Sequence, residues 1–154
     1  MSVTTHGRAL VALVATLGAL GTGCSHSKKE FEDINPAVPG THFRRIATIS
    51  SDDAGTAIRL MVQTREKLKQ AGIDAQSATG RWESASDAVS QICAPGVDLP
   101  VDGVLIMSYD HMTLYDCATA RPAYDIQGSP MSGGMGIDEM TKRLIKYLEG
   151  HEEG

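Results

Sequence analysis

The chain has 154 residues, a formal net charge of −5, three cysteines and 42% hydrophobic residues. This length fits one domain with a tail and excludes a two-domain enzyme. The acidic balance argues against a nucleic-acid-binding protein, which normally carries a basic face. Three is an odd number of cysteines for a short chain, and it requires an explanation because exported domains usually pair their cysteines in disulfides.

The first 23 residues have the pattern of an export signal. Residues 1–8 contain one arginine, Arg8, and no acidic residue, and residues 9–20 are an uninterrupted run of small and apolar side chains. A helix of that length spans about 18 Å, which is short of the roughly 30 Å hydrocarbon core of a membrane. We therefore interpret the segment as the signal helix of a secretory leader. The alternatives are a leader without lipidation and a buried N-terminal helix of a cytosolic domain.

The leader ends in a sequence that resembles the lipobox of bacterial lipoproteins. Thr22, Gly23 and Cys24 match the small residues and the cysteine of that motif, and Gly21 stands where an aliphatic residue is usual. The resemblance implies cleavage before Cys24 and lipidation of its thiol and amine with acyl chains such as palmitate. Two or more chains suffice for stable membrane anchoring. By the same resemblance, Ser25 implies an outer-membrane location, with the domain facing the periplasm of a Gram-negative bacterium.

Lipidation of Cys24 would leave Cys93 and Cys117 for the exported domain. An even pair of cysteines in an oxidising compartment predicts one disulfide. That bond would close a loop of about 25 residues and stabilise the fold by roughly 3 kcal/mol. The alternative is a pair of buried thiols that do not meet.

Composition divides the rest of the chain into a tether, one domain and a tail. Residues 24–42 are polar, with mixed charge and two prolines. We interpret them as the lipidated cysteine and a flexible tether. A single α/β domain is expected over residues 43–150, and residues 151–154 form a polar tail.

The first half of the domain alternates strands and helices. A run rich in β-branched side chains predicts a strand over residues 43–50. Apolar side chains that recur on one face predict a helix over residues 54–71, and Gly72 is a residue that favours a helix end. A short, weak strand is expected over residues 73–78.

The second helix begins near Ser84, because Ser84 and Asp87 approximate a capping box before a regular apolar stripe. Pro95 and Gly96 follow that stripe and end the helix. Residues 102–108 contain the strongest strand of the chain. The centre of this strand is apolar at every position, so we expect it to be central and buried on both faces.

The last third of the chain predicts a hairpin and a helix. Residues 112–117 and 122–127 are strands that bracket a turn. A glycine-rich loop over residues 129–136 leads to an amphipathic helix that starts at Ile137. The element order is βαβαβββα, and we expect an α/β sandwich that has three helices and a mixed sheet of about five strands.

The hairpin resembles small envelope lipoprotein domains with an anticodon-binding-like α/β fold. They include the curli-secretion lipoprotein and the lipoprotein activators of penicillin-binding proteins, which carry a pattern similar to Leu-x-Asp-x-x-Thr-Gly on the late hairpin. Asp116 and Thr119 match that pattern, and Ala120 stands where glycine is usual. The resemblance covers about residues 43–149. It implies a fold and an envelope location, and it carries over no catalytic residue.

Patterns typical of catalysis or metal binding are weak. His111 is the only histidine within the predicted domain, and its neighbour Asp110 would point to the opposite face of a strand. An enzyme would need His111 to face a carboxylate across a cleft. The chain has no Gly-x-Ser-x-Gly motif and no Cys-x-x-Cys pair. We therefore expect no enzymatic activity, no metal site and no cofactor.

Two features are candidate binding elements. Trp82, the single tryptophan, precedes the second helix and would either anchor a protein partner or pack on the sheet. The glycine-rich loop would present backbone N–H groups to an anion, or would only form a tight start of the helix. The loop candidates are Ser132, Gly133, Gly134 and Gly136. The sequence thus supports a lipid-anchored, non-enzymatic binding or structural module with an envelope protein partner. The alternative is a periplasmic small-ligand protein that binds an anion through the loop.

Overall fold

The computed structural model describes residues 30–52, 55–98 and 100–150. The predicted leader, Cys24 and the polar tail lie outside the described residues. None of the described helices is both long and apolar enough to cross a membrane.

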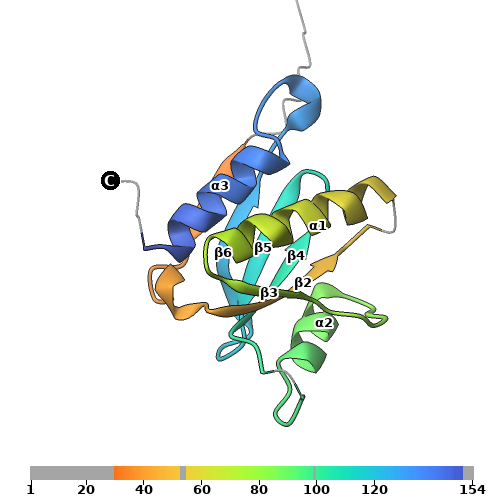
Figure 1. Ribbon diagram of the computed structural model, residues 1–154, viewed down its shortest axis with the longest axis vertical. Coiled ribbons are helices and arrows are strands. Elements are labelled where there is room, and N and C mark those ends of the chain that lie inside the picture. The colour runs from red at the N-terminus through yellow and green to blue at the C-terminus, as the bar shows by residue number, and fades with distance from the viewer. Residues whose placement is uncertain (1–29, 53–54, 99, 151–154) are drawn as a thin grey trace, which may run out of the picture.

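Six strands form one mixed sheet in the order β1-β6-β5-β4-β2-β3 (Figure 1). The strands are β1 Phe31–Ile34, β2 Arg45–Ser50, β3 Asp74–Ser77, β4 Gly103–Met107, β5 His111–Asp116 and β6 Arg121–Gln127. Strand β2 runs parallel to β3 and β4, and the remaining neighbours are antiparallel. The mixed sheet confirms the predicted fold class, with one strand more than the approximate count of five.

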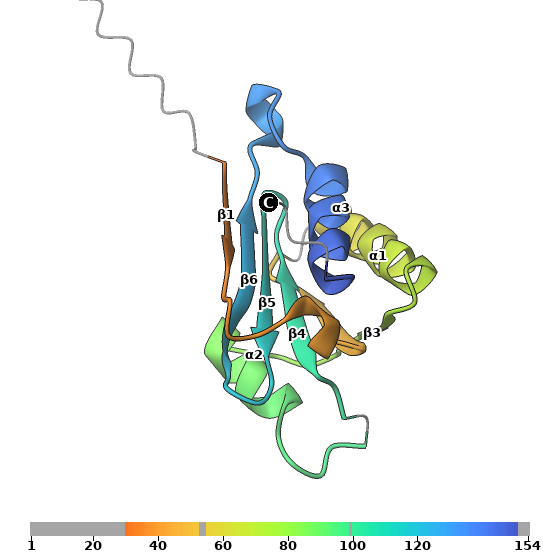
Figure 2. The same ribbon diagram turned by 90° about the vertical axis from the view of Figure 1, so that its left-hand side faces the viewer.

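Helices cover the sheet unequally. The three helices are α1 Gly55–Gln70, α2 Ala85–Ile92 and α3 Ile137–Leu148, and two short 3₁₀ helices are η1 Gly40–His42 and η2 Pro130–Ser132. Helices α1 and α3 lie on one face, whereas the short α2 lies on the other (Figures 1 and 2). Because α2 has only eight residues, part of the second face lacks a helical cover.

Strand β4 is central and buried on both faces, as the sequence predicted. It lies between β2 and β5, and neither Val104 nor Leu105 has any exposed surface. Leu105 contributes to the main core under α1 and α3, and Val104 contributes to a second core under α2. Side chains that alternate across a strand explain how one apolar run serves both cores.

Two hydrogen bonds and one contact between rings hold the helices of the main core. The hydroxyls of Thr64 in α1 and Thr141 in α3 are hydrogen-bonded at 3.1 Å, with both residues buried. The rings of Tyr124 and Tyr147 stack with their centroids 4.9 Å apart. Burial, and to a smaller degree the charge of Asp116, raises the pKa of Tyr147 to about 12. The neutral phenol donates a hydrogen bond to the carbonyl of Val38 at 2.7 Å.

The folded part of the chain starts earlier than residue 43, so the prediction of a flexible tether is wrong for residues 31–42. Strand β1 pairs along its whole length with β6, from Phe31 opposite Gln127 to Ile34 opposite Tyr124. The carboxylate of Glu32 accepts hydrogen bonds from the Tyr124 hydroxyl at 2.6 Å and from Arg143 at 3.1 Å. These partners lie about a hundred residues away, which is why local composition gave no sign of the strand.

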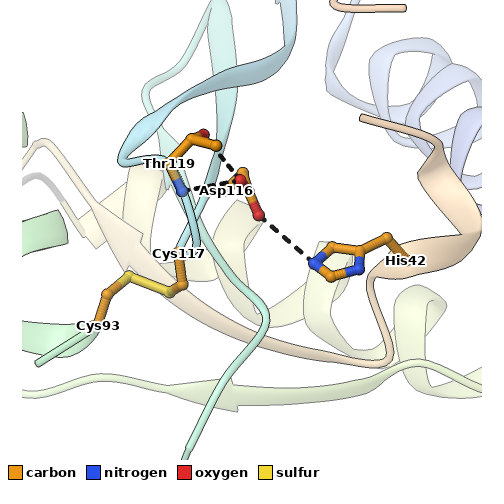
Figure 3. The surroundings of a disulfide bond; sticks show 5 residues. All are labelled: His42, Cys93, Asp116, Cys117 and Thr119. Atoms are coloured by element: carbon orange, nitrogen blue, oxygen red, sulfur yellow. Dashed lines mark hydrogen bonds and ion pairs between the residues drawn. A yellow bond between two sulfur atoms is a disulfide. The ribbon is translucent and has the colours of Figure 1, made fainter. Parts of the chain in front are cut away.

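The predicted disulfide is present between Cys93 and Cys117, with an S–S distance of 2.03 Å and a Cα–Cα distance of 5.2 Å. It joins the C-cap of α2 to the residue that follows β5 (Figure 3). Both cysteines pack against the second core. A helix of eight residues is marginal by itself, so the bond holds α2 on the sheet where the core is small.

Replacing both cysteines by serine (C93S/C117S) should lower the free energy of unfolding by about 3 kcal/mol, because the open chain gains loop entropy when it unfolds. Urea unfolding followed by circular dichroism measures this loss. A reducing agent should reproduce it in the parent chain and leave the double variant unaffected. Equal midpoints for parent and variant would contradict a stabilising role for the bond.

Candidate functional site

Trp82 borders two hollows on the face of the sheet that carries α2. Their volumes are about 320 and 820 Å³. The indole is half-buried and packs against the second core. Trp82 therefore packs on the core, which is one of its two interpretations, and its ring also lines a concave surface.

The larger hollow lies beyond the carboxyl ends of β2 and β4, next to the start of α2. Apolar side chains from both strands and α2 lie beneath polar groups, among them the exposed Arg81 and the hydroxyls of Ser50 and Ser51. A smaller hollow of about 210 Å³ adjoins it and shares Ser51 and Ile106 with it. We call the hollow of about 820 Å³ and this hollow of about 210 Å³ together the α2 groove. In open α/β sheets, ligands commonly bind beyond the carboxyl ends of parallel strands.

The start of α2 is capped by its own side chains. The hydroxyl of Ser84 accepts a hydrogen bond from the backbone N–H of Asp87 at 3.1 Å. The carboxylate of Asp87 accepts in turn from the N–H of Glu83, also at 3.1 Å. The predicted capping arrangement is therefore present, with the carboxylate bonded one residue before the cap. These contacts occupy the backbone N–H groups of Glu83 and Asp87 at the rim of the groove.

A polar cluster from β5 and β6 continues along the open half of this face. The burial of β5 alternates residue by residue, and its half-exposed members are His111, Thr113 and Tyr115. Asp125 in β6 accepts hydrogen bonds on one oxygen from His111 Nε2 at 2.7 Å and from Thr113 Oγ1 at 2.5 Å. Burial, and to a smaller degree the charge of Asp125, raises the pKa of Tyr115 above its ordinary value.

Asp125 is the carboxylate that sequence reasoning did not connect with His111. The antiparallel register places Asp125 opposite Thr113. His111 lies two residues before Thr113, so its side chain is on the same face of the sheet. The predicted hairpin contained that signal, but only a correct register reveals it. The contact between His111 and Asp125 is a diagonal contact between neighbouring strands and spans no cleft.

The glycine-rich loop already holds a carboxylate, that of Glu30. The backbone N–H of Met135 and the hydroxyl of Ser129 both donate to Glu30 Oε1, the latter at 3.1 Å. A Cβ at position 134 would overlap that oxygen, so the Glu30 carboxylate can occupy this place only beside a glycine. The donors in this loop therefore bind a carboxylate of the chain itself.

The loop candidates lie together, but they lie apart from Trp82. Gly133 follows η2 in a left-handed conformation, and Gly136 is the N-cap of α3. Ser132 belongs to η2, and its side chain lies outside the described part of the chain. The loop lies at one end of the molecule, and α2 lies toward the other (Figures 1 and 2).

Asp116 organises the turn between β5 and β6. Its Oδ2 accepts hydrogen bonds from the N–H of Thr119 at 3.0 Å and from its hydroxyl at 2.7 Å (Figure 3). Its buried Oδ1 lies 3.5 Å from His42 Nε2. The Asp-x-x-Thr pattern singled out in the sequence is thus a turn-forming device. The next residue, Ala120, is the only non-glycine with a positive φ (56°) among the described residues.

Within the described ranges, no three acidic, histidine or cysteine side chains are grouped so that they could hold a metal ion.

Comparisons with known proteins yield only distant similarity. No protein-family model and no curated protein matches the chain. Among solved structures, the chain is similar to a PelC dodecamer from Paraburkholderia phytofirmans, with 13% sequence identity and a TM-score of 0.42 over 80% of this chain and 95% of that one. A single-substitution variant of that dodecamer gives the same identity and TM-score, with 96% of that chain covered.

Ala120→Gly should stabilise the protein by about 1 kcal/mol, because a left-handed conformation is unfavourable for a residue with a Cβ and free of that penalty for glycine. Urea unfolding measures the change. Ala118→Gly, in the same turn but without a positive φ, is the matched control and should not stabilise. An equal loss of stability in both variants would contradict the conformational explanation.

Proposed function

We propose that the chain is a lipid-anchored bacterial envelope protein that acts as a non-enzymatic binding or structural module. In this proposal Cys24 carries the lipid, and the domain faces the periplasm from the outer membrane. The disulfide is the observation that carries the proposal. Its formation requires an oxidising compartment, and pairing Cys93 with Cys117 leaves Cys24 as the one cysteine outside the bond.

The polar contacts of the domain favour a binding module over an enzyme. His111 and Thr113 both bond to one oxygen of Asp125 on the neighbouring strand. His111 therefore meets this carboxylate directly and not across a cleft. The alternative of an anion-binding protein is less favoured, because a free anion would have to displace Glu30 from Met135 N–H and the Ser129 hydroxyl.

The α2 groove is the surface that we assign to an envelope protein partner. Its wall combines a half-buried tryptophan, Trp82, with an exposed arginine, Arg81. Tryptophan and arginine are enriched among residues that dominate protein–protein binding energies. The half-buried Ile106, which also lines the groove, would be covered by a bound partner.

Mass spectrometry of the protein isolated from bacterial membranes tests the anchor. The expected mass is that of a chain cleaved before Cys24, increased by its acyl groups and lowered by two hydrogens for the disulfide. Cys24→Ser should abolish the acyl mass and release the protein from membranes, whereas C93S/C117S should keep both the acyl mass and the membrane association. An intact Met1 with three free thiols would refute the proposal.

Charge reversal in the groove tests the partner surface. Arg81→Glu should reduce the amount of partner that co-purifies from solubilised envelopes at least tenfold, because it places a like or uncompensated charge in the contact. Arg59→Glu makes the same charge change at an exposed position of α1, on the other face of the sheet, and should leave capture unchanged. Equal capture by both variants would exclude the groove as the binding surface. Quantitative mass spectrometry of the captured material gives the ratio.

A further inference from the structure

One end of the domain gathers exposed apolar side chains. Met131, at the tip of the glycine-rich loop, is 89% exposed, and Phe31 and Tyr109 are 41% and 40% exposed. Single exposed apolar residues are ordinary on protein surfaces. These three, however, belong to segments far apart in the sequence and lie at one end.

Sheet register and one hydrogen bond place the three residues at that end. Phe31 pairs with Gln127, the last residue of β6, directly before the loop that carries Met131. The N–H of Gly128 donates to the carbonyl of Asp110 at 2.8 Å, which ties the loop to the turn that contains Tyr109. Figure 2 shows that β1 begins at this end and that η2 forms its extremity.

The length of the chain before β1 brings the lipid to the same end. Cys24 is six residues before Glu30, so even a fully extended chain separates them by only about 21 Å. Glu30 itself is fixed to the loop through Met135 N–H and the Ser129 hydroxyl. A domain of this size is about 35 Å across. A lipid on Cys24 would therefore hold the loop close to the bilayer, with the opposite end of the domain turned away from it.

The loop has the composition of a surface that rests on lipid. Residues 128–136 contain glycine, serine, proline and methionine and no charged residue. No residue of this segment is charged, so insertion of Met131 at the boundary between head groups and acyl chains buries a flexible apolar side chain without burying a charge of the segment itself.

We propose that this end of the domain, which we call the loop end and define by Phe31, Tyr109 and residues 128–136, lies on the membrane and inserts Met131 into its interfacial region. The proposal rests on the proposed lipidation of Cys24. It deepens the proposed function by fixing how the domain is oriented on the bilayer: the lipid anchor and the loop end share one contact with the membrane.

Tryptophan fluorescence of the acylated, full-length protein tests this orientation. Trp82→Phe removes the single native tryptophan, and M131W or V97W is then added in that background. Val97 is exposed to 40% and lines a hollow beside α2, away from the loop end. Both proteins are placed in vesicles of phosphatidylethanolamine and phosphatidylglycerol, with or without bromine on the acyl chains.

Brominated lipid should quench the M131W protein at least twofold and leave the V97W protein unquenched, and only the M131W emission should shift to shorter wavelength. Equal quenching of the two proteins, with the acyl mass present and both bound to vesicles, would overturn the orientation and leave the proposed function intact. The same blue shift of M131W without vesicles would indicate a contact between protein copies and also overturn it. Absence of the acyl mass would overturn the proposed function together with this inference.

Discussion

The burial of strand β4 on both faces is the constraint on which the rest of the structure depends. Its apolar run needs cover on two sides, because one side chain in two points to each face of a sheet. Helices α1 and α3 provide a large core for Leu105, and α2 provides a small one for Val104. The small core explains the disulfide, since a helix of eight residues needs a further attachment. It also explains the groove, because α2 leaves part of its face uncovered.

The pairing of β1 with β6 also determines where the chain enters the domain. The four residues of β1, one of which is Glu32, and the preceding Glu30 fasten the segment to β6, the glycine-rich loop and α3. The segment after the proposed lipid site is therefore short. A short link to a lipid restricts the orientation of a domain, and the proposed lipid on Cys24 would direct an uncharged loop with the exposed Met131 toward the bilayer.

Features that depend on neighbours in sequence were predicted well. Helix α1 ends before Gly72, which has the expected positive φ, and Ser84 caps α2 through its side chain. Features that depend on distant partners were missed or left open. Strand β1 was taken for a tether because Phe31–Ile34 is half acidic, and Asp125 was not linked to His111 because their contact depends on the register of a hairpin. For the glycine-rich loop, both anion binding and a tight helix start were left open, and local sequence gave no indication that Glu30 bonds to Met135 N–H and the Ser129 hydroxyl.

By itself, the sequence determined the fold class, the order of helices and strands from residue 43 onward, the central position of β4, and the pairing of Cys93 with Cys117 as the preferred interpretation. Periodicity, caps and cysteine parity are local or countable properties, and these predictions needed nothing more. Only the tertiary structure decided that Glu30 occupies the loop, that Trp82 lines a groove while it packs on a core, and that β1 completes the sheet. Each of these features is a contact between segments far apart in the sequence. Its energy is gained only when folding has brought those segments together.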